Sequence, residues 1–211
     1  MDTSIGWIGI GIDILSSDPF FSQIIDLNKE LVKYGSNYNI NLIPPHINLY
    51  DIDIPVKNFE EVDRKLKEIS DSHNSFEISC SKVDYFKHGS IYLSCDLNED
   101  IKNLQQDIVK NISTLRGNIK TKEYWESWRE YTEDQLQNRE KYGNPHILNS
   151  FVPHITIGFI KDNNILKDVN IKLNELFKPV VYKVSHFNLV IKNSENKTIK
   201  TISYKLNTQL G

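Results

Sequence analysis

The sequence predicts a mixed α/β fold of the α+β kind, with two pseudo-symmetric lobes of antiparallel sheet and flanking helices around a central cleft. Segments with strand-like and helix-like hydrophobic periods alternate along the chain, and paired strands follow several of the helices. Each half also contains a strand with a Pro-His motif, then a helix, then paired strands. This order favours layered lobes in which helices cover antiparallel sheet.

The first half of the chain is predicted to alternate strands and helices before it forms a hairpin. Alternating isoleucines mark the first strand, and Asp18-Pro19 provides an N-cap and a first-turn proline for the first helix. Pro44-Pro45 interrupts the second strand region. The predicted elements are a strand at 7–14, a helix at 18–33, a strand at 40–54, a helix from about 58, a hairpin of 76–83 with 90–97, and a helix from 98.

The second half repeats this order after a segment of different composition. Residues 117–148 mix aromatic and charged side chains and end in the turn Gly143-Asn144-Pro145, so we interpret them as inserted and partly helical. Because no low-complexity linker divides the chain, we expect one domain over residues 1–211. The remaining predicted elements are a strand at 151–160, a helix at 165–177, a long strand at 180–191 and a last strand at 198–206.

The composition excludes several classes of protein. The 25 Lys and Arg residues against 28 Asp and Glu give a formal net charge of −3, which argues against an extended nucleic-acid surface. The apolar run at 7–15 is short and contains Asp13, so we expect no membrane span or signal peptide. Cys80 and Cys95 lack disulfide-framework or zinc-ligand spacing. We therefore expect a cytoplasmic monomer with buried cysteines and no metal or other cofactor.

Two short motifs contain the residues with the strongest catalytic pattern, Pro45-His46-Ile47-Asn48 and Pro153-His154-Ile155-Thr156. In a strand, positions i and i+2 point to the same face, so each motif places an imidazole beside a small polar side chain. Such a pair on the inward face of a strand requires either buried hydrogen-bond partners or an open cleft. The sequence therefore predicts that both motifs face a cleft.

Paired histidines suit phosphodiester cleavage without a metal. A neutral imidazole removes a proton from water or a ribose hydroxyl, while a protonated imidazole donates a proton to the leaving oxygen. The neighbouring polar side chains, Asn48 and Thr156, can hydrogen-bond a non-bridging phosphate oxygen. We therefore predict His46, His154, Thr156 and Asn48 as the catalytic residues, and the pattern does not say which histidine is the base.

These motifs resemble the signature of the two-histidine (2H) phosphoesterase superfamily, which includes RNA 2′,3′-cyclic phosphodiesterases and the proteins called 2′-5′ RNA ligases. That signature is His-apolar-Thr/Ser-apolar, present twice on symmetry-related strands. The run from His154 to Phe159 matches it fully, whereas Asn48 stands where Thr or Ser is usual. The resemblance implies a bilobal fold, no metal, and a nucleotide or RNA-end substrate with a 2′,3′-cyclic phosphate, a 2′-5′ linkage or a cyclic oligonucleotide.

Asn48 leaves one alternative to an ordinary enzyme of this family open. An amide can donate to phosphate as a hydroxyl does, but it is longer. The chain is therefore predicted either to be an active phosphodiesterase or to be a catalytically weak module that binds nucleotides or RNA ends. A metallohydrolase that uses His46 and His154 as ligands is less favoured, because neither motif contains a carboxylate.

Aromatic and basic residues near the motifs are predicted to bind the substrate. Tyr50 is expected to share the face of His46 and Asn48, although it can also serve in cross-strand packing. Trp125 and Trp128 are spaced to dock an inserted helix onto the body. The run 139–145, which contains Tyr142, resembles one that precedes the second motif in a superfamily branch from phosphonate-metabolism gene clusters. The predicted substrate-binding residues are Tyr50, Tyr85, Lys87, Tyr124, Arg129 and Tyr142.

Overall fold

A computed structural model describes residues 4–119, 130–193, 195 and 197–208. Their strands form one eight-stranded sheet in the order β6-β3-β4-β5-β2-β1-β7-β8, and all neighbouring strands are antiparallel. The strands are β1 (Ile5–Asp13), β2 (His46–Pro55), β3 (Phe76–Tyr85), β4 (Ser90–Cys95), β5 (His154–Phe159), β6 (Val180–Val184), β7 (His186–Lys192) and β8 (Thr198–Lys205). The helices are α1 (Pro19–Val32), α2 (Phe59–Ser72), α3 (Glu99–Ile112), α4 (Glu133–Tyr142) and α5 (Leu166–Leu176), with short 3₁₀ turns η1 (Val56–Asn58), η2 (Ser113–Arg116) and η4 (Leu148–Ser150).

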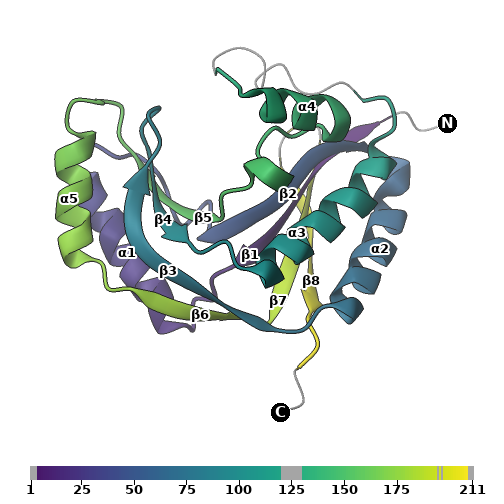
Figure 1. The fold of residues 1–211 in the computed structure, drawn as a ribbon, viewed down its shortest axis with the longest axis horizontal. Coiled ribbons are helices and arrows are strands. Elements are labelled where there is room, and N and C mark those ends of the chain that lie inside the picture. The colour runs from purple at the N-terminus through teal and green to yellow at the C-terminus, as the bar shows by residue number, and fades with distance from the viewer. Residues whose placement is uncertain (1–3, 120–129, 194, 196, 209–211) are drawn as a thin grey trace.

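The sheet consists of two four-stranded halves that meet where β2 pairs with β5. Helices α1 and α5 cover the half made of β5, β4, β3 and β6, and helices α2 and α3 cover the other half (Figure 1). The α+β class and the two antiparallel lobes are therefore confirmed. We use the term open face for the sheet face that points away from these four helices.

The covered face forms the core because apolar residues alternate along the strands and recur at helical spacing. On β1, Ile8, Ile10 and Ile12 are almost fully buried, whereas the intervening positions are Gly9 and Gly11. The predicted N-cap of α1 is present, since the side chain of Asp18 accepts a hydrogen bond from the Phe20 backbone at 2.8 Å. The inward stripe of α1 is Phe20, Ile24, Leu27 and Leu31.

The predicted order of elements is confirmed, with two differences. Strand β2 begins at His46, so residues 40–45 of the predicted strand lie outside it. The long strand predicted at 180–191 is two strands that break at Ser185 and pair in different halves of the sheet. Strand β6 lies beside β3, while β7 lies beside β1. The buried apolar positions are Tyr182 and Val184 before the break and Phe187, Leu189 and Ile191 after it, so the alternation changes phase at Ser185. The sequence pattern therefore contains a sign of the break, although it does not name the new pairing partner.

Helix α4 lies within the segment predicted as an insertion. Thr132 and Gln135 form a capping box at its start, and Gly143, at a left-handed φ of 83°, ends it. Figure 1 shows α4 above β2. No helix in the described part of the chain is long and apolar enough to cross a membrane.

Candidate active site

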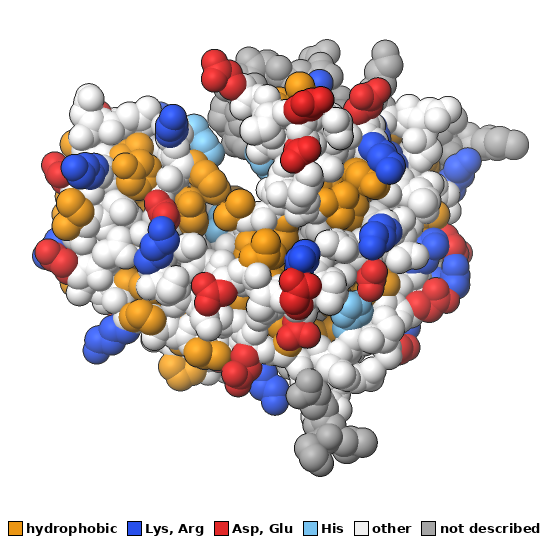
Figure 2. Space-filling model, viewed as in Figure 1, with side chains coloured by type: hydrophobic (Ala, Val, Ile, Leu, Met, Phe, Trp, Pro, Cys, Tyr) orange, Lys and Arg blue, Asp and Glu red, His pale blue; other side chains and the backbone are white. Residues whose placement is uncertain are grey.

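The two histidine motifs meet at the centre of the sheet. Strands β2 and β5 pair at Ile47 and Ile155, and both isoleucines are fully buried on the covered face. In this antiparallel register, His46 is placed beside Thr156 and Asn48 beside His154, with all four side chains on the open face. The structure thus brings together the four residues predicted to be catalytic. The surface is hollowed between the α5 side and the α4 side, with histidine side chains on the walls (Figure 2).

Both imidazole rings are fixed by the same backbone contact. Nδ1 of His46 lies 2.8 Å from the carbonyl oxygen of Pro44, and Nδ1 of His154 lies 2.7 Å from that of Val152. A carbonyl oxygen only accepts, so each Nδ1 carries the hydrogen. Nε2 is therefore the atom of each ring that can gain or lose a proton during a reaction.

The backbone beside each histidine is also held in the same way in the two halves. The Pro45 carbonyl accepts a hydrogen bond from the Ile14 backbone at 2.9 Å, and the Pro153 carbonyl accepts one from the Cys95 backbone at 3.1 Å. Each motif is thus tied to the neighbouring strand on its outer side, just before the histidine.

A β-bulge follows each motif at the equivalent position. Leu49 is the extra residue in β2, between Asn48 and Tyr50, and Ile157 is the extra residue in β5, between Thr156 and Gly158. A bulge leaves a backbone group without its ladder partner.

Buried amide side chains satisfy both bulge carbonyls. Gln105 of α3 donates to the Leu49 carbonyl at 3.2 Å, and Asn28 of α1 donates to the Ile157 carbonyl at 2.8 Å. Gln105 and Asn28 are only 1% and 7% exposed. Two buried polar residues thus support the shape of the two strands that contain the histidine motifs.

His154 lies against aromatic rings. The rings of Phe86 and Tyr92 approach it edge-on, with centroids 5.2 and 5.1 Å away, and stack on each other at 4.3 Å. Burial lowers the pKa of His154 below its ordinary value, and the charge of nearby His46 lowers it further, while the Val152 carbonyl partly offsets both. His154 is therefore held in its neutral form near neutral pH.

The surroundings of His46 are polar instead. Asp13 is its direct cross-strand neighbour on β1, and Asp13 accepts a hydrogen bond from the Asn188 side chain at 2.5 Å. A Cβ added at Gly11 would lie 3.7 Å from the His46 ring, so the absence of a side chain there keeps this flank open. Sequence reasoning missed Asp13 as a site residue, although its alternation with Gly11 on β1 places it on the same face.

Asn48 is held by Asp51, which is held in turn by Asn144, and the sequence did not indicate either contact. Its side-chain amide donates to Oδ1 of Asp51 at 2.7 Å, and the amide of Asn144 donates to the same oxygen at 2.9 Å. Asp51 and Asn144 are 8% and 2% exposed.

Two of the predicted substrate-binding residues lie elsewhere than expected. Tyr50 does not share the face of His46 and Asn48, because the bulge turns it to the other face; it is fully buried and donates to the Tyr142 carbonyl at 2.5 Å. Tyr85 pairs with Ile91 and packs against the core, on the face opposite to His154. The prediction that Tyr50 lines the cleft is therefore wrong, and Tyr85 is placed for packing.

Of the other predicted substrate-binding residues, Lys87 lies in a turn near the histidine site. Lys87 is exposed in the β3–β4 turn, between Phe86 and His88, whose rings stack at 5.5 Å. It is thus close in sequence to the aromatic rings beside His154. The predicted contacts Tyr124 and Arg129, with Trp125 and Trp128, lie outside the described residues.

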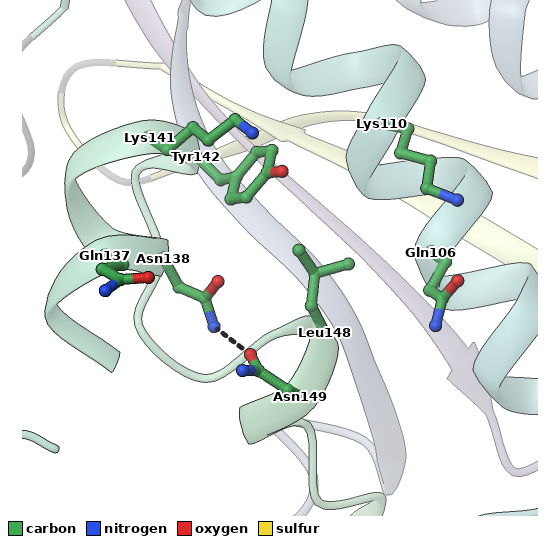
Figure 3. Close-up of a pocket in the computed structure, with 8 residues that line it drawn as sticks. All are labelled: Gln106, Lys110, Gln137, Asn138, Lys141, Tyr142, Leu148 and Asn149. Atoms are coloured by element: carbon green, nitrogen blue, oxygen red, sulfur yellow. Dashed lines mark hydrogen bonds between the residues drawn. The ribbon is translucent and has the colours of Figure 1, made fainter. Parts of the chain in front are cut away.

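Tyr142 lines a pocket of about 440 Å³ between α3 and the α4–η4 segment (Figure 3). None of the four predicted catalytic residues lines this pocket. Its lining residues are Gln106, Lys110, Gln137, Asn138, Lys141, Tyr142, Leu148 and Asn149. The carbonyl of Tyr142 anchors the buried Tyr50 of β2.

Among residues 4–119 and 130–193 and the described residues beyond them, no three His, Cys, Asp or Glu side chains gather so that they could hold a metal ion. The metallohydrolase alternative therefore gains no support from the described side chains.

A comparison with known protein families identifies the family of this chain. A family model for the 2'-5' RNA ligase superfamily matches residues 23–196. The chain belongs to this superfamily, whose members are 2H phosphoesterases. A search of curated protein sequences finds no match.

Solved structures of the superfamily share the fold over nearly the whole chain. The structure of TT0787 from Thermus thermophilus has a TM-score of 0.62 at 12% identity, covering 95% of this chain and 98% of that one. E. coli LigT in its apo form has a TM-score of 0.60 at 12% identity, covering 97% and 99%. LigT complexed with 3'-AMP has a TM-score of 0.59 at 11% identity, covering 96% of each chain. At such identities the likeness establishes the fold alone.

Proposed function

We propose that this 2H phosphoesterase superfamily member is a metal-independent enzyme that hydrolyses a cyclic phosphate or phosphodiester of a nucleotide or RNA end. The matched arrangement of His46 and His154 is the observation that supports this proposal most strongly. Both rings are locked through Nδ1, and both lie beside a polar side chain at the centre of the sheet. Two imidazoles that each offer Nε2 suit a reaction at one phosphate group in which one ring removes a proton from the attacking water and the other donates a proton to the leaving oxygen.

The difference between the two surroundings suggests separate roles. His154 is kept neutral by burial and by His46, so it is suited to remove a proton from the attacking water. His46, on the polar flank near Asp13, then donates a proton to the leaving ribose oxygen. Thr156 donates a hydrogen bond to a non-bridging phosphate oxygen beside His46.

A second candidate function is a binding module with weak turnover, and Asn48 is the observation that favours it. Asn48 uses one N–H of its amide on Asp51, which leaves fewer donors for phosphate than a free amide has. Tight binding of a cyclic nucleotide without product after long incubation would support this alternative.

A panel assay tests the proposal. EDTA-treated protein is incubated with 2′,3′-cyclic mononucleotides, 2′-5′ and 3′-5′ linked dinucleotides and cyclic dinucleotides, and the products are identified by mass spectrometry. We expect hydrolysis of at least one class in EDTA, with loss of activity in His46→Ala and in His154→Ala. Full activity in either variant would contradict the proposal. LigT has been crystallised with 3'-AMP and with phosphate, so phosphate-bearing ligands are the first to test.

We further propose that the protein acts in the cytoplasm as a monomer on a nucleotide or a single RNA end, without an extended nucleic-acid surface. The net charge of −3 and the central position of both histidines agree with a compact substrate.

A further inference from the structure

We propose that Asp51 and Asn144 are positioning residues that orient the amide of Asn48, so that the three residues together replace the single threonine of the other half-site. This inference rests on the proposed function, and it assigns a task to two residues outside the histidine motifs. It explains how an asparagine can occupy this position without losing a defined geometry.

The strand register places Asp51 on the open face. Asn48 pairs with Gly11 and Asp51 pairs with Gly9, and alternate residues of β1 share one face. Asn48 and Asp51 are three residues apart, so a regular strand would point them to opposite faces. The bulge at Leu49 removes this difference and brings the carboxylate within 2.7 Å of the amide.

Asp51 is itself fixed by the inserted segment. The Asn144 amide donates to Oδ1 of Asp51 at 2.9 Å and approaches the Asp51 carbonyl at 3.3 Å. The other end of the Asn144 side chain accepts a hydrogen bond from the His146 backbone at 2.8 Å. Asn144 thus has partners at both ends of its amide, and it is almost fully buried, so its position is well defined.

The chemistry of the contact fixes which way the Asn48 amide faces. A carboxylate oxygen accepts hydrogen bonds, so Asn48 must turn its NH₂ toward Asp51. The torsion that rotates an asparagine amide is broad, and without such a partner the oxygen and nitrogen would exchange places freely. With the NH₂ held, the second N–H and the amide oxygen have fixed directions on the open face, beside His154.

The other half-site shows why this support is specific to Asn48. Thr156 has a β-branched side chain with few rotamers, so it needs less help to hold its hydroxyl. The residue equivalent to Asp51 is Phe159, which lies on the same face as Thr156 after the bulge at Ile157. This position thus holds a carboxylate in the half-site of Asn48, whose side chain rotates more freely, and an aromatic ring in the half-site of Thr156.

The test compares Asp51 variants in two backgrounds. Asp51→Leu removes the acceptor and is expected to lower kcat for a cyclic phosphate by about fivefold to tenfold, no more than the loss expected when the Asn48 side chain itself is removed, with a smaller change in KM. Asp51→Asn keeps an acceptor oxygen and should retain most activity. In the Asn48→Thr background, Asp51→Leu should cost only about twofold, because a threonine does not need the carboxylate. Equal losses in both backgrounds would overturn the inference, since they would indicate a purely structural role for Asp51.

Two further measurements keep the result interpretable. Asp53→Asn, a carboxylate on the same strand, is the matched control and should change kcat by no more than about twofold. The side-chain NH₂ resonances of Asn48 in ¹⁵N NMR spectra, assigned by their loss in Asn48→Thr, give a readout without turnover. They should show one hydrogen-bonded, slowly exchanging proton that becomes solvent-like in Asp51→Leu. Resonances that do not respond to Asp51→Leu would overturn the inference, whether or not the protein is an active hydrolase.

Discussion

The half-site around His46 and the half-site around His154 have the same backbone arrangement and differ in their side chains. In each, a proline carbonyl bonds the outer strand, an imidazole bonds the carbonyl two residues before it, and a bulge follows three residues after the histidine. A buried amide from the covering helix then satisfies the bulge carbonyl. The fold therefore produces the same local geometry twice, and the functional asymmetry lies in what surrounds it.

The surroundings of His154 are apolar, whereas those of His46 are polar. His154 lies among aromatic rings and has a lowered pKa, and its half-site has a simple hydroxyl donor in Thr156. His46 lies near Asp13, and its half-site has an amide held by Asp51. An apolar setting favours a neutral base, which leaves the role of proton donor to His46.

The largest loss of activity is expected when either histidine is replaced. His46→Ala and His154→Ala should each lower kcat/KM by about 10²- to 10⁴-fold, because each removes one proton-transfer partner. The double variant should be little worse than the poorer single variant, since two residues that act as a unit are not additive. Steady-state kinetics on the best panel substrate give these values. Independent, multiplicative losses would show that the half-sites do not act together.

Replacing Thr156 or Asn48, the polar residue beside each histidine, should lower kcat by smaller and unequal factors. Thr156→Val removes a phosphate donor and should lower kcat by about 10²-fold. Asn48→Ala should cost only about tenfold, because part of its amide is already engaged by Asp51. The same assay measures both variants, with circular dichroism as the folding control. A greater loss from Asn48→Ala would reverse the assigned asymmetry.

The helix amides should affect stability to a similar extent in both halves. Gln105→Leu and Asn28→Leu each leave a bulge carbonyl buried without its amide donor, so each should lower the free energy of unfolding by about 1–3 kcal/mol. Urea denaturation measures the change. Asn170→Leu on α5, a polar residue that is half-buried and supports no bulge, is the control. No loss of stability in either variant would show that the bulges do not depend on these amides.

The sequence predicted those parts of the site that depend on local spacing. A separation of two residues was enough to place His46 with Asn48 and His154 with Thr156. The bulges depend instead on the partner strands and the covering helices, which no local pattern describes. For this reason Tyr50 was placed on the wrong face and Asp51 was missed. The division of residues 180–191 into β6 and β7 did have a local sign, because the apolar alternation changes phase between Val184 and Phe187. The strands with which the two pieces pair depend on the whole sheet.

The pH dependence of kcat/KM in the presence of EDTA tests whether neutral His154 acts as the base of a metal-independent reaction. If neutral His154 is the base, activity falls as the pH drops through the His154 pKa, so the acidic limb should lie below the ordinary histidine value of about 6.5. An alkaline limb should mark the loss of the proton from the general acid. We expect this bell-shaped profile without added metal. Activity that disappears in EDTA and returns with a divalent metal, or an acidic limb clearly above 6.5, would contradict it.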